Sequence, residues 1–159
     1  MRTRSALGLA AALTLAACAH PAPRSAPPMS WSLNHTESEG AKLAYGVPQT
    51  DQVLVMMTCQ MNSGRVEVSM TAPQDRAQGR IGLASRGERL DLTADVAPSP
   101  MGDIAVVMAE TDAGQAALDR FARSGDLTVS GQGRAVKAAA RGEDREKVAD
   151  FFGACRRAA

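Results

Sequence analysis

Residues 89–96 read Arg-Leu-Asp-Leu-Thr-Ala-Asp-Val, the clearest alternation of apolar and polar residues in this chain. Because successive side chains of a β-strand point to opposite sides, this order places the two leucines, Ala94 and Val96 on one face. The charged residues and the threonine between them lie on the other face, where water solvates them. The stretch therefore predicts a strand that is buried on one side only.

The same two-residue period recurs on both sides of this stretch. Gln52–Cys59 and Arg65–Thr71 carry an apolar residue at every second position, and shorter segments have strand-forming composition: Trp31–Asn34, Lys42–Val47, Arg80–Ser85, Asp103–Glu110, Leu127–Ser130 and Ala135–Ala138. The links Asn62-Ser63-Gly64 and Arg86-Gly87 tolerate the positive φ of hairpin turns, and Gly131-x-Gly133 is a further turn between strands. Short strands in series predict a mainly β fold, an antiparallel sandwich or an open barrel.

Two segments have helical spacing instead. Asp112–Arg123 predicts one short internal helix, with Gly125 after its end. Glu143–Arg157 predicts a C-terminal helix, because its apolar residues form one stripe at i, i+3, i+4 and i+7: Val148, Phe151, Phe152 and Cys155. Acids at its start and arginines at its end suit the helix dipole. We expect residues 30–157 to form a single β-rich domain with this helix packed on the sheet.

The first seventeen residues have a different composition from the rest. Arg2 and Arg4 give a positive start, and the apolar run Ala6–Ala17 follows with two interruptions. A charged start, a short apolar core and small residues before the cleavage site are the three parts of a secretory signal peptide. A membrane-spanning helix needs roughly twenty apolar residues, so this core is too short to span. Residues 1–17 are therefore expected to be a signal peptide.

Leu15-Ala16-Ala17-Cys18 resembles the lipobox of bacterial lipoproteins. The resemblance implies that Cys18 becomes the first mature residue and carries acyl chains such as palmitate. Each buried methylene contributes about 0.8 kcal/mol, so several chains make a stable membrane anchor. The alternative is an ordinary signal peptide with a chance cysteine near its cleavage site.

The residues after Cys18 indicate how the domain is held. Ala19, rather than an aspartate, implies the outer membrane under the enterobacterial sorting rule, with the protein on the inner leaflet facing the periplasm. The choice between inner and outer membrane stays open, because that rule varies between bacterial groups. Residues 18–29 combine the lipidated cysteine with a stretch rich in proline and alanine, which predicts an extended tether.

The charge balance excludes one class of function. Removal of residues 1–17 leaves 142 residues (159 − 17), and the loss of Arg2 and Arg4 leaves 16 basic against 17 acidic side chains. A chain so close to neutral lacks the positive charge of a polyanion binder. One tryptophan, one tyrosine and three phenylalanines give no row of stacking platforms for single-stranded nucleic acid. We expect no nucleic-acid partner.

The remaining cysteines, Cys59 and Cys155, both fall on faces predicted to be buried. Exported proteins meet an oxidising compartment, in which thiols pair. A disulfide closing a loop of about a hundred residues contributes up to about 4.7 kcal/mol in the chain-entropy model. We expect Cys59 and Cys155 to form this bond and to pin the C-terminal helix to the sheet; the alternative is two inert buried thiols.

Motifs for catalysis and metal binding are missing from the sequence. The part predicted to fold has one histidine, His35, within a polar stretch, and the chain has no Gly-x-Ser-x-Gly, Cys-x-x-Cys or His-x-x-x-His. A run of arginines is interspersed with acids, which favours a solvated surface over a positive patch: Arg76, Arg80, Arg86 and Arg89. We expect no catalytic residue, no metal and no cofactor.

Part of the chain resembles a loose group of small exported alphaproteobacterial proteins to which no activity is assigned. The residues that carry the likeness are Trp31, Ala44-Tyr45-Gly46-Val47-Pro48, Asp51, Cys59 and Phe151-Phe152-Gly153-Ala154-Cys155. A more distant likeness is to the invasion-associated locus B family. Another is to the membrane-bound C-type lysozyme inhibitors, whose barrel is stapled by one cysteine near a strand end and one near the C-terminus. Their inhibitory Ser-Gly loop is matched in composition only, by Ser124-Gly125 after a predicted helix.

These observations predict a lipid-anchored, periplasm-facing module that is not an enzyme. It would bind an envelope protein or serve an envelope-structural role. The alternative is an inhibitor of a periplasmic hydrolase such as lysozyme, and a third hypothesis is an enzyme whose site is built from acids and arginines. The sequence leaves the partner's identity and the oligomeric state open.

Overall fold

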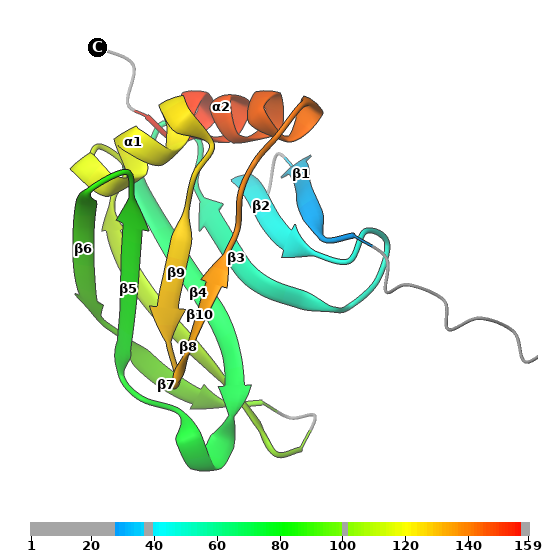
Figure 1. Cartoon of the computed structure of the whole chain (residues 1–159), viewed down its shortest axis with the longest axis vertical. Helices are drawn as coiled ribbons and strands as arrows, with labels where there is room; N and C mark the ends of the chain where they lie inside the picture. Colours follow the sequence, from blue (N-terminus) through cyan, green and yellow to red (C-terminus); the bar gives the residue numbers. More distant parts are fainter. Residues whose placement is uncertain (1–27, 37–39, 100–101, 157–159) are drawn as a thin grey trace, which may run out of the picture.

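A computed structural model describes residues 28–36, 40–99 and 102–156. Cys18, the predicted signal peptide and nearly all of the predicted tether lie outside the described residues. Within the described ranges the chain forms two antiparallel sheets and two α-helices (Figure 1). The two sheets face each other as a sandwich and do not close into a barrel, so the prediction of a mainly β antiparallel fold is confirmed. Neither described helix has the length and apolar character to cross a membrane.

Sheet A has six strands in the order β1-β2-β3-β4-β8-β7. Their bounds are β1 Ser30–Thr36, β2 Gly40–Gly46, β3 Val53–Cys59, β4 Arg65–Pro73, β8 Ile104–Asp112 and β7 Asp95–Pro98. Sheet B has four strands in the order β10-β9-β5-β6: β10 Arg134–Lys137, β9 Thr128–Gly131, β5 Arg80–Ser85 and β6 Glu88–Thr93. A short 3-10 helix, η1, covers Gln74–Arg76 between β4 and β5.

Two-residue turns close the two hairpins of sheet B, β5–β6 and β9–β10. Arg86 and Gly87 have φ of 43° and 92° between the paired residues at the ends of β5 and β6. Gln132 and Gly133 have φ of 58° and 71° between β9 and β10. Positive φ at both turn positions matches the right-handed twist of the strands. Both turns confirm the sequence prediction.

The stretch 89–96 is not one strand, as its alternation predicts, but parts of two. β6 ends at Thr93 in sheet B and β7 begins at Asp95 in sheet A, so the chain crosses between sheets at Ala94. The Ala94 amide donates to the Gly79 carbonyl (3.0 Å), a bond that lies outside both ladders. Val96 lies on the last strand of sheet A and is 43% exposed, so it does not share a buried face with the leucines.

The helices α1, Ala116–Ser124, and α2, Glu143–Cys155, lie across one end of the sandwich (Figure 1). The prediction that α1 begins at Asp112 is wrong, because Asp112 pairs with Arg65 as the last residue of β8. Its Oδ1 then accepts a hydrogen bond from Gly114 (2.7 Å), which turns the chain before the helix. α2 carries the predicted stripe, with all four of its apolar residues buried, and ends at Cys155 rather than in the arginines.

All five aromatic residues form one cluster between the helices and sheet A. Trp31 lies 5.2 Å from Tyr45 and 5.4 Å from Phe121, measured between ring centroids. Phe152 lies 6.0 Å from Phe121 and 5.2 Å from Phe151. Tilted and edge-to-face rings of this kind contribute about 0.5–1.5 kcal/mol per pair beyond their buried area. The few aromatic side chains are thus concentrated where α1 and α2 meet β1 and β2.

Side chains of α2 cap the edge of sheet A at Trp31, near the start of β1. The Trp31 amide donates to Oδ2 of Asp144 (3.0 Å), and the Lys147 ammonium donates to the Trp31 carbonyl (3.0 Å). Asp144 and Lys147 also pair with each other at 2.8 Å. These charged groups satisfy backbone positions that would otherwise be open to another strand.

Candidate binding face

One face of sheet A packs inward and the other faces solvent. The inward face meets sheet B and the two helices (Figure 1) and carries most of the buried core of the sheet. We call the other side the open face. Its central row crosses all six strands in register: Ser32, Ala44, Met56, Ser69, Met108 and Asp95.

The centre of the open face is apolar. Met56 and Met108 lie on either side of Ser69 and are partly exposed, whereas Ser69 between them is only 5% exposed. A hollow of about 220 Å³ adjoins this row and is lined by Leu54, Met56, Ser69, Thr71 and Val106, among others. Methionine is flexible and polarisable, and it is common on surfaces that adapt to a protein partner.

The end of the open face next to the β3–β4 turn is polar. A hollow of about 330 Å³ is lined there by Thr58, Gln60, Ser63, Arg65, Glu67 and Glu110, beside Cys59. Glu67 and Glu110 are directly opposite each other on β4 and β8. The Nε of Arg65 lies 2.5 Å from Oε1 of Glu110. The hollow therefore holds two carboxylates and one guanidinium.

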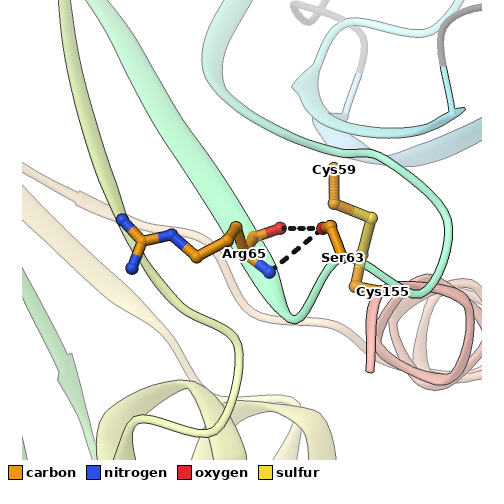
Figure 2. The surroundings of a disulfide bond; sticks show 4 residues. All are labelled: Cys59, Ser63, Arg65 and Cys155. Atoms are coloured by element: carbon orange, nitrogen blue, oxygen red, sulfur yellow. Dashed lines mark hydrogen bonds between the residues drawn. A yellow bond between two sulfur atoms is a disulfide. The ribbon is translucent and has the colours of Figure 1, made fainter. Parts of the chain in front are cut away.

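The disulfide holds the wall of this hollow in place. Cys59, at the end of β3, is joined to Cys155, at the end of α2, with 5.7 Å between their Cα atoms (Figure 2). The predicted pairing of these two cysteines is therefore present in the structure. Because Cys155 is fully buried and Cys59 is nearly so, the bond lies inside the domain while the hollow opens outward.

The β3–β4 turn is fixed by the same helix end. The amides of Asn62 and Gly64 donate to the carbonyls of Ala154 and Cys155, at 2.9 and 2.8 Å. These are carbonyls of the last helical turn, which have no partner within the helix. Ser63 fixes the start of β4, because its hydroxyl accepts a hydrogen bond from the Arg65 amide and donates one to the Arg65 carbonyl (Figure 2). The turn and α2 thus position Arg65 and, two residues further along β4, Glu67.

The two outer faces of the sandwich differ in charge. The open face of sheet A carries four acids against two bases: Glu67, Asp95, Glu110 and Asp112 against Lys42 and Arg65. The outer face of sheet B has a centre of small residues, and its charged residues are three bases against one acid: Arg80, Arg89 and Lys137 against Asp91. The apolar patch therefore belongs to the acidic side of the molecule.

The arginines between residues 76 and 89 are divided: Arg80 and Arg89 lie on the outer face of sheet B, whereas Arg76 and Arg86 lie in connecting segments. Arg76 lies 3.8 Å from Asp75, while Arg86 reaches Asp126 at 2.6 Å on the link after α1. Arg141 also bonds Asp126. Hydrogen bonds from Arg141 and then Arg86 hold the pKa of the Asp126 carboxyl below its ordinary value. These arginines act as separate surface contacts, as the interspersed acids predict.

The candidate catalytic residues lie in different places within the part of the chain that the structure describes. His35 is exposed on β1 opposite Ala41, and it does not line the hollow that contains the glutamates. Within the described residues, no three side chains of the metal-binding types lie close enough together to hold an ion. Glu67 and Glu110 lie opposite each other and line one hollow, as the third hypothesis requires, and that hypothesis stays a prediction.

Ser124-Gly125, the composition match to an inhibitory loop, lies at the end of α1. Gly125 has φ of 72° and donates to the Phe121 carbonyl, which is a left-handed helix cap. A Cβ at Gly125 would lie 2.6 Å from the Ala140 carbonyl oxygen, so the residue is packed against the chain. The Ser124 hydroxyl accepts from the Asp126 amide at 3.1 Å. Both residues therefore have structural roles at this site.

Comparison with models of known protein families, with curated proteins and with solved structures found no match to this chain. The likenesses described from the sequence therefore remain predictions, and the candidate site is argued from the geometry of the chain itself.

Sequence reasoning missed the open face as a site. The alternation in Gln52–Cys59 and Arg65–Thr71 correctly separates an inward face from an outward one. The available signal was the composition of the outward positions: Leu54, Met56, Val106 and Met108 are apolar where a solvated face would be polar.

Proposed function

We propose that this protein is a lipid-anchored, periplasm-facing module that binds an envelope protein, with no enzymatic step, through the open face of sheet A. The observation that carries the proposal is the apolar centre of that face around Met56 and Met108. Contiguous apolar surface exposed on a soluble domain marks an interaction site. The rigid sheet beneath it and the disulfide beside it hold such a surface ready for a partner.

The anchor and the tether support the same proposal. Acylation at Cys18 would fix the chain to a membrane, and the stretch rich in proline and alanine up to residue 29 would hold the domain away from the lipid. The substitution Cys18→Ala tests the anchor by fractionation of cells that make the full chain. We expect the variant to move from the membrane fraction to the soluble fraction, whereas His20→Ala stays in the membrane. An unchanged distribution of the Cys18 variant would refute the anchor.

Cross-linking and affinity capture from intact envelopes test the binding face. The full-length protein is compared with Met108→Glu on the open face and Thr128→Glu on the outer face of sheet B. We expect the partner captured by the wild type to be lost with the first variant and kept with the second. Equal capture by all three proteins would contradict the proposal. Thermal unfolding of the purified variants checks that both keep the fold.

A further inference from the structure

The open face carries more detail than an apolar patch. It has three successive rows along β4, each two residues from the next: an acidic row at Glu67, a methionine row at Ser69 and an aliphatic row at Thr71. Resting on the function proposed above, we infer that the partner binds through a polypeptide segment that presents a basic side chain to Glu67 and Glu110 and apolar side chains to the other two rows.

The basic side chain is required by the charges in the larger hollow. Like charges directly opposite each other on neighbouring strands are destabilising, and Glu67 and Glu110 are such a pair. Arg65 supplies one cation, which lies against Glu110. A second cation from a partner would sit between the carboxylates and relieve their repulsion. The excess of acids on the whole face would attract the same partner over a longer range.

The apolar side chains are required by the other two rows. Met56 and Met108 flank Ser69, and Val106 lies opposite Thr71 beside the smaller hollow. From Glu67 to Thr71 the strand advances four residues, which is about 13 Å. An extended segment spans this distance with a basic residue at one position and apolar residues two and four positions further on. This spacing matches side chains on one face of a strand, and strands of stacked sheets run nearly parallel to one another.

The charge of the face favours a polypeptide over the other possible occupants. Anionic lipid headgroups would meet four acids and only two bases. A second copy of this chain could offer its basic sheet B face, but the centre of that face consists of small residues: Gly82, Ala84, Thr128, Ser130 and Ala135. Such a flat centre cannot fill the 220 Å³ hollow on the open face.

Three synthetic peptides test the inference. They are Ser-Lys-Thr-Leu-Thr-Leu-Ser, the same peptide with glutamate in place of lysine, and the lysine peptide with serine in place of both leucines. The protein is the chain from residue 18 to 159 with Cys18→Ala, labelled with ¹³C at the methionine methyl groups. We expect the lysine–leucine peptide to shift the Met56 and Met108 signals saturably and to leave that of Met29, 42% exposed just before β1, in place. The other two peptides should bind at least about tenfold more weakly.

The matched protein variants are Glu67→Gln on the open face and Glu146→Gln on α2. Glu67→Gln should weaken binding of the lysine–leucine peptide about two- to fivefold and reduce the difference in affinity between the lysine and glutamate peptides. Glu146→Gln should leave both affinities unchanged. Equal binding of the lysine and glutamate peptides would overturn the inference about charge and leave the binding face itself standing.

Other outcomes identify a different occupant or none. Shifts of the Met56 and Met108 signals on dilution of the protein alone would show that a second copy covers the face. Shifts with vesicles containing anionic lipid, and not with the peptides, would show a lipid surface. Either result overturns the inference, and so does the absence of any shift with the lysine–leucine peptide. Loss of the envelope partner on Met108→Glu would still support the proposed function in that last case.

Discussion

At the scale of single residues, Asp126 connects parts of the chain that are far apart in sequence. It lies between α1 and β9 and accepts hydrogen bonds from Arg141, just before α2, and from Arg86 in the β5–β6 turn. Arg141 also donates to the Ala140 carbonyl at 2.8 Å. The carboxylate thus holds three connecting segments together at one end of sheet B.

The substitution Asp126→Asn should lower stability in a way that depends on pH. The pKa of Asp126 in the folded protein is below that of an unfolded chain, about 3.9, so its ionised form is stabilised by folding. That contribution is fully present above the unfolded pKa and is lost as the pH falls through the folded pKa. The free energy of unfolding measured in urea should therefore be lower for the variant than for the wild type at pH 5–7, and this difference should shrink as the pH falls.

The exposed Asp150 on α2 provides the control. The free energy of unfolding of Asp150→Asn should stay closer to that of the wild type at every pH measured. A gap between wild type and Asp126→Asn that does not narrow as the pH falls would contradict the account, because protonation of Asp126 makes the two side chains alike in charge.

The sequence predicts residue types on faces better than it predicts such partners. Acids among the arginines indicated a solvated surface, and that much is confirmed. The pairing of Arg86 with Asp126 could not be predicted, since forty residues separate them and their contact depends on how α1 packs. The same holds for the contact between Asp144 and the Trp31 amide, which are 113 residues apart.

At the scale of elements, α2 is fastened to sheet A along its whole length. Asp144 and Lys147 bond the backbone of β1 near its start, Phe151 and Phe152 join the aromatic cluster, and Cys155 bonds β3 at its end. The apolar stripe of α2 can be predicted from the sequence, because its residues follow one another at helical spacing. The contact of α2 with the β1 edge cannot be predicted in this way, because acidic residues in a first helical turn are also explained by the helix dipole.

Removal of the Asp144 carboxylate should open the β1 edge. Asp144→Ala leaves the Trp31 amide without its acceptor and Lys147 without its ion-pair partner, and we expect the free energy of unfolding to fall by about 1–3 kcal/mol. Amide hydrogen exchange at Trp31 should become faster. Glu143→Ala is the control, because it removes another acid from the first turn of α2 and so changes the interaction with the helix dipole without removing the contact with Trp31. If both variants exchange at the same rate as the wild type, the edge is not protected by this contact.

Loss of the disulfide should destabilise the whole domain. The bond joins residues separated by 96 positions, and for such a loop the chain-entropy model gives up to about 4.7 kcal/mol. We expect the double variant Cys59→Ala with Cys155→Ala to unfold at a lower urea concentration. Reduction of the wild type should lower its midpoint by a similar amount. A double variant as stable as the oxidised wild type would show that the bond does not contribute.

At the scale of the whole molecule, the strand pattern was predictable and its division between sheets was not. Nearly every predicted strand is present, because alternation and turn residues are local properties. The continuous alternation of residues 89–96 predicts one strand, although the chain changes sheets at Ala94. Which sheet a strand joins depends on contacts distant in sequence. For the same reason the alternation separates two faces of sheet A but does not tell which of them stays uncovered.

The most direct test of the central claim is oxidation footprinting of methionine in intact envelopes and in the purified protein. Met56 and Met108 lie on the open face, and Met29, 42% exposed just before β1, serves as the internal reference. We expect Met56 and Met108 to oxidise several times more slowly, relative to Met29, in the envelope than in the purified protein, because a partner covers them. Equal relative rates in the two preparations would contradict the claim that the open face of sheet A is where this protein binds.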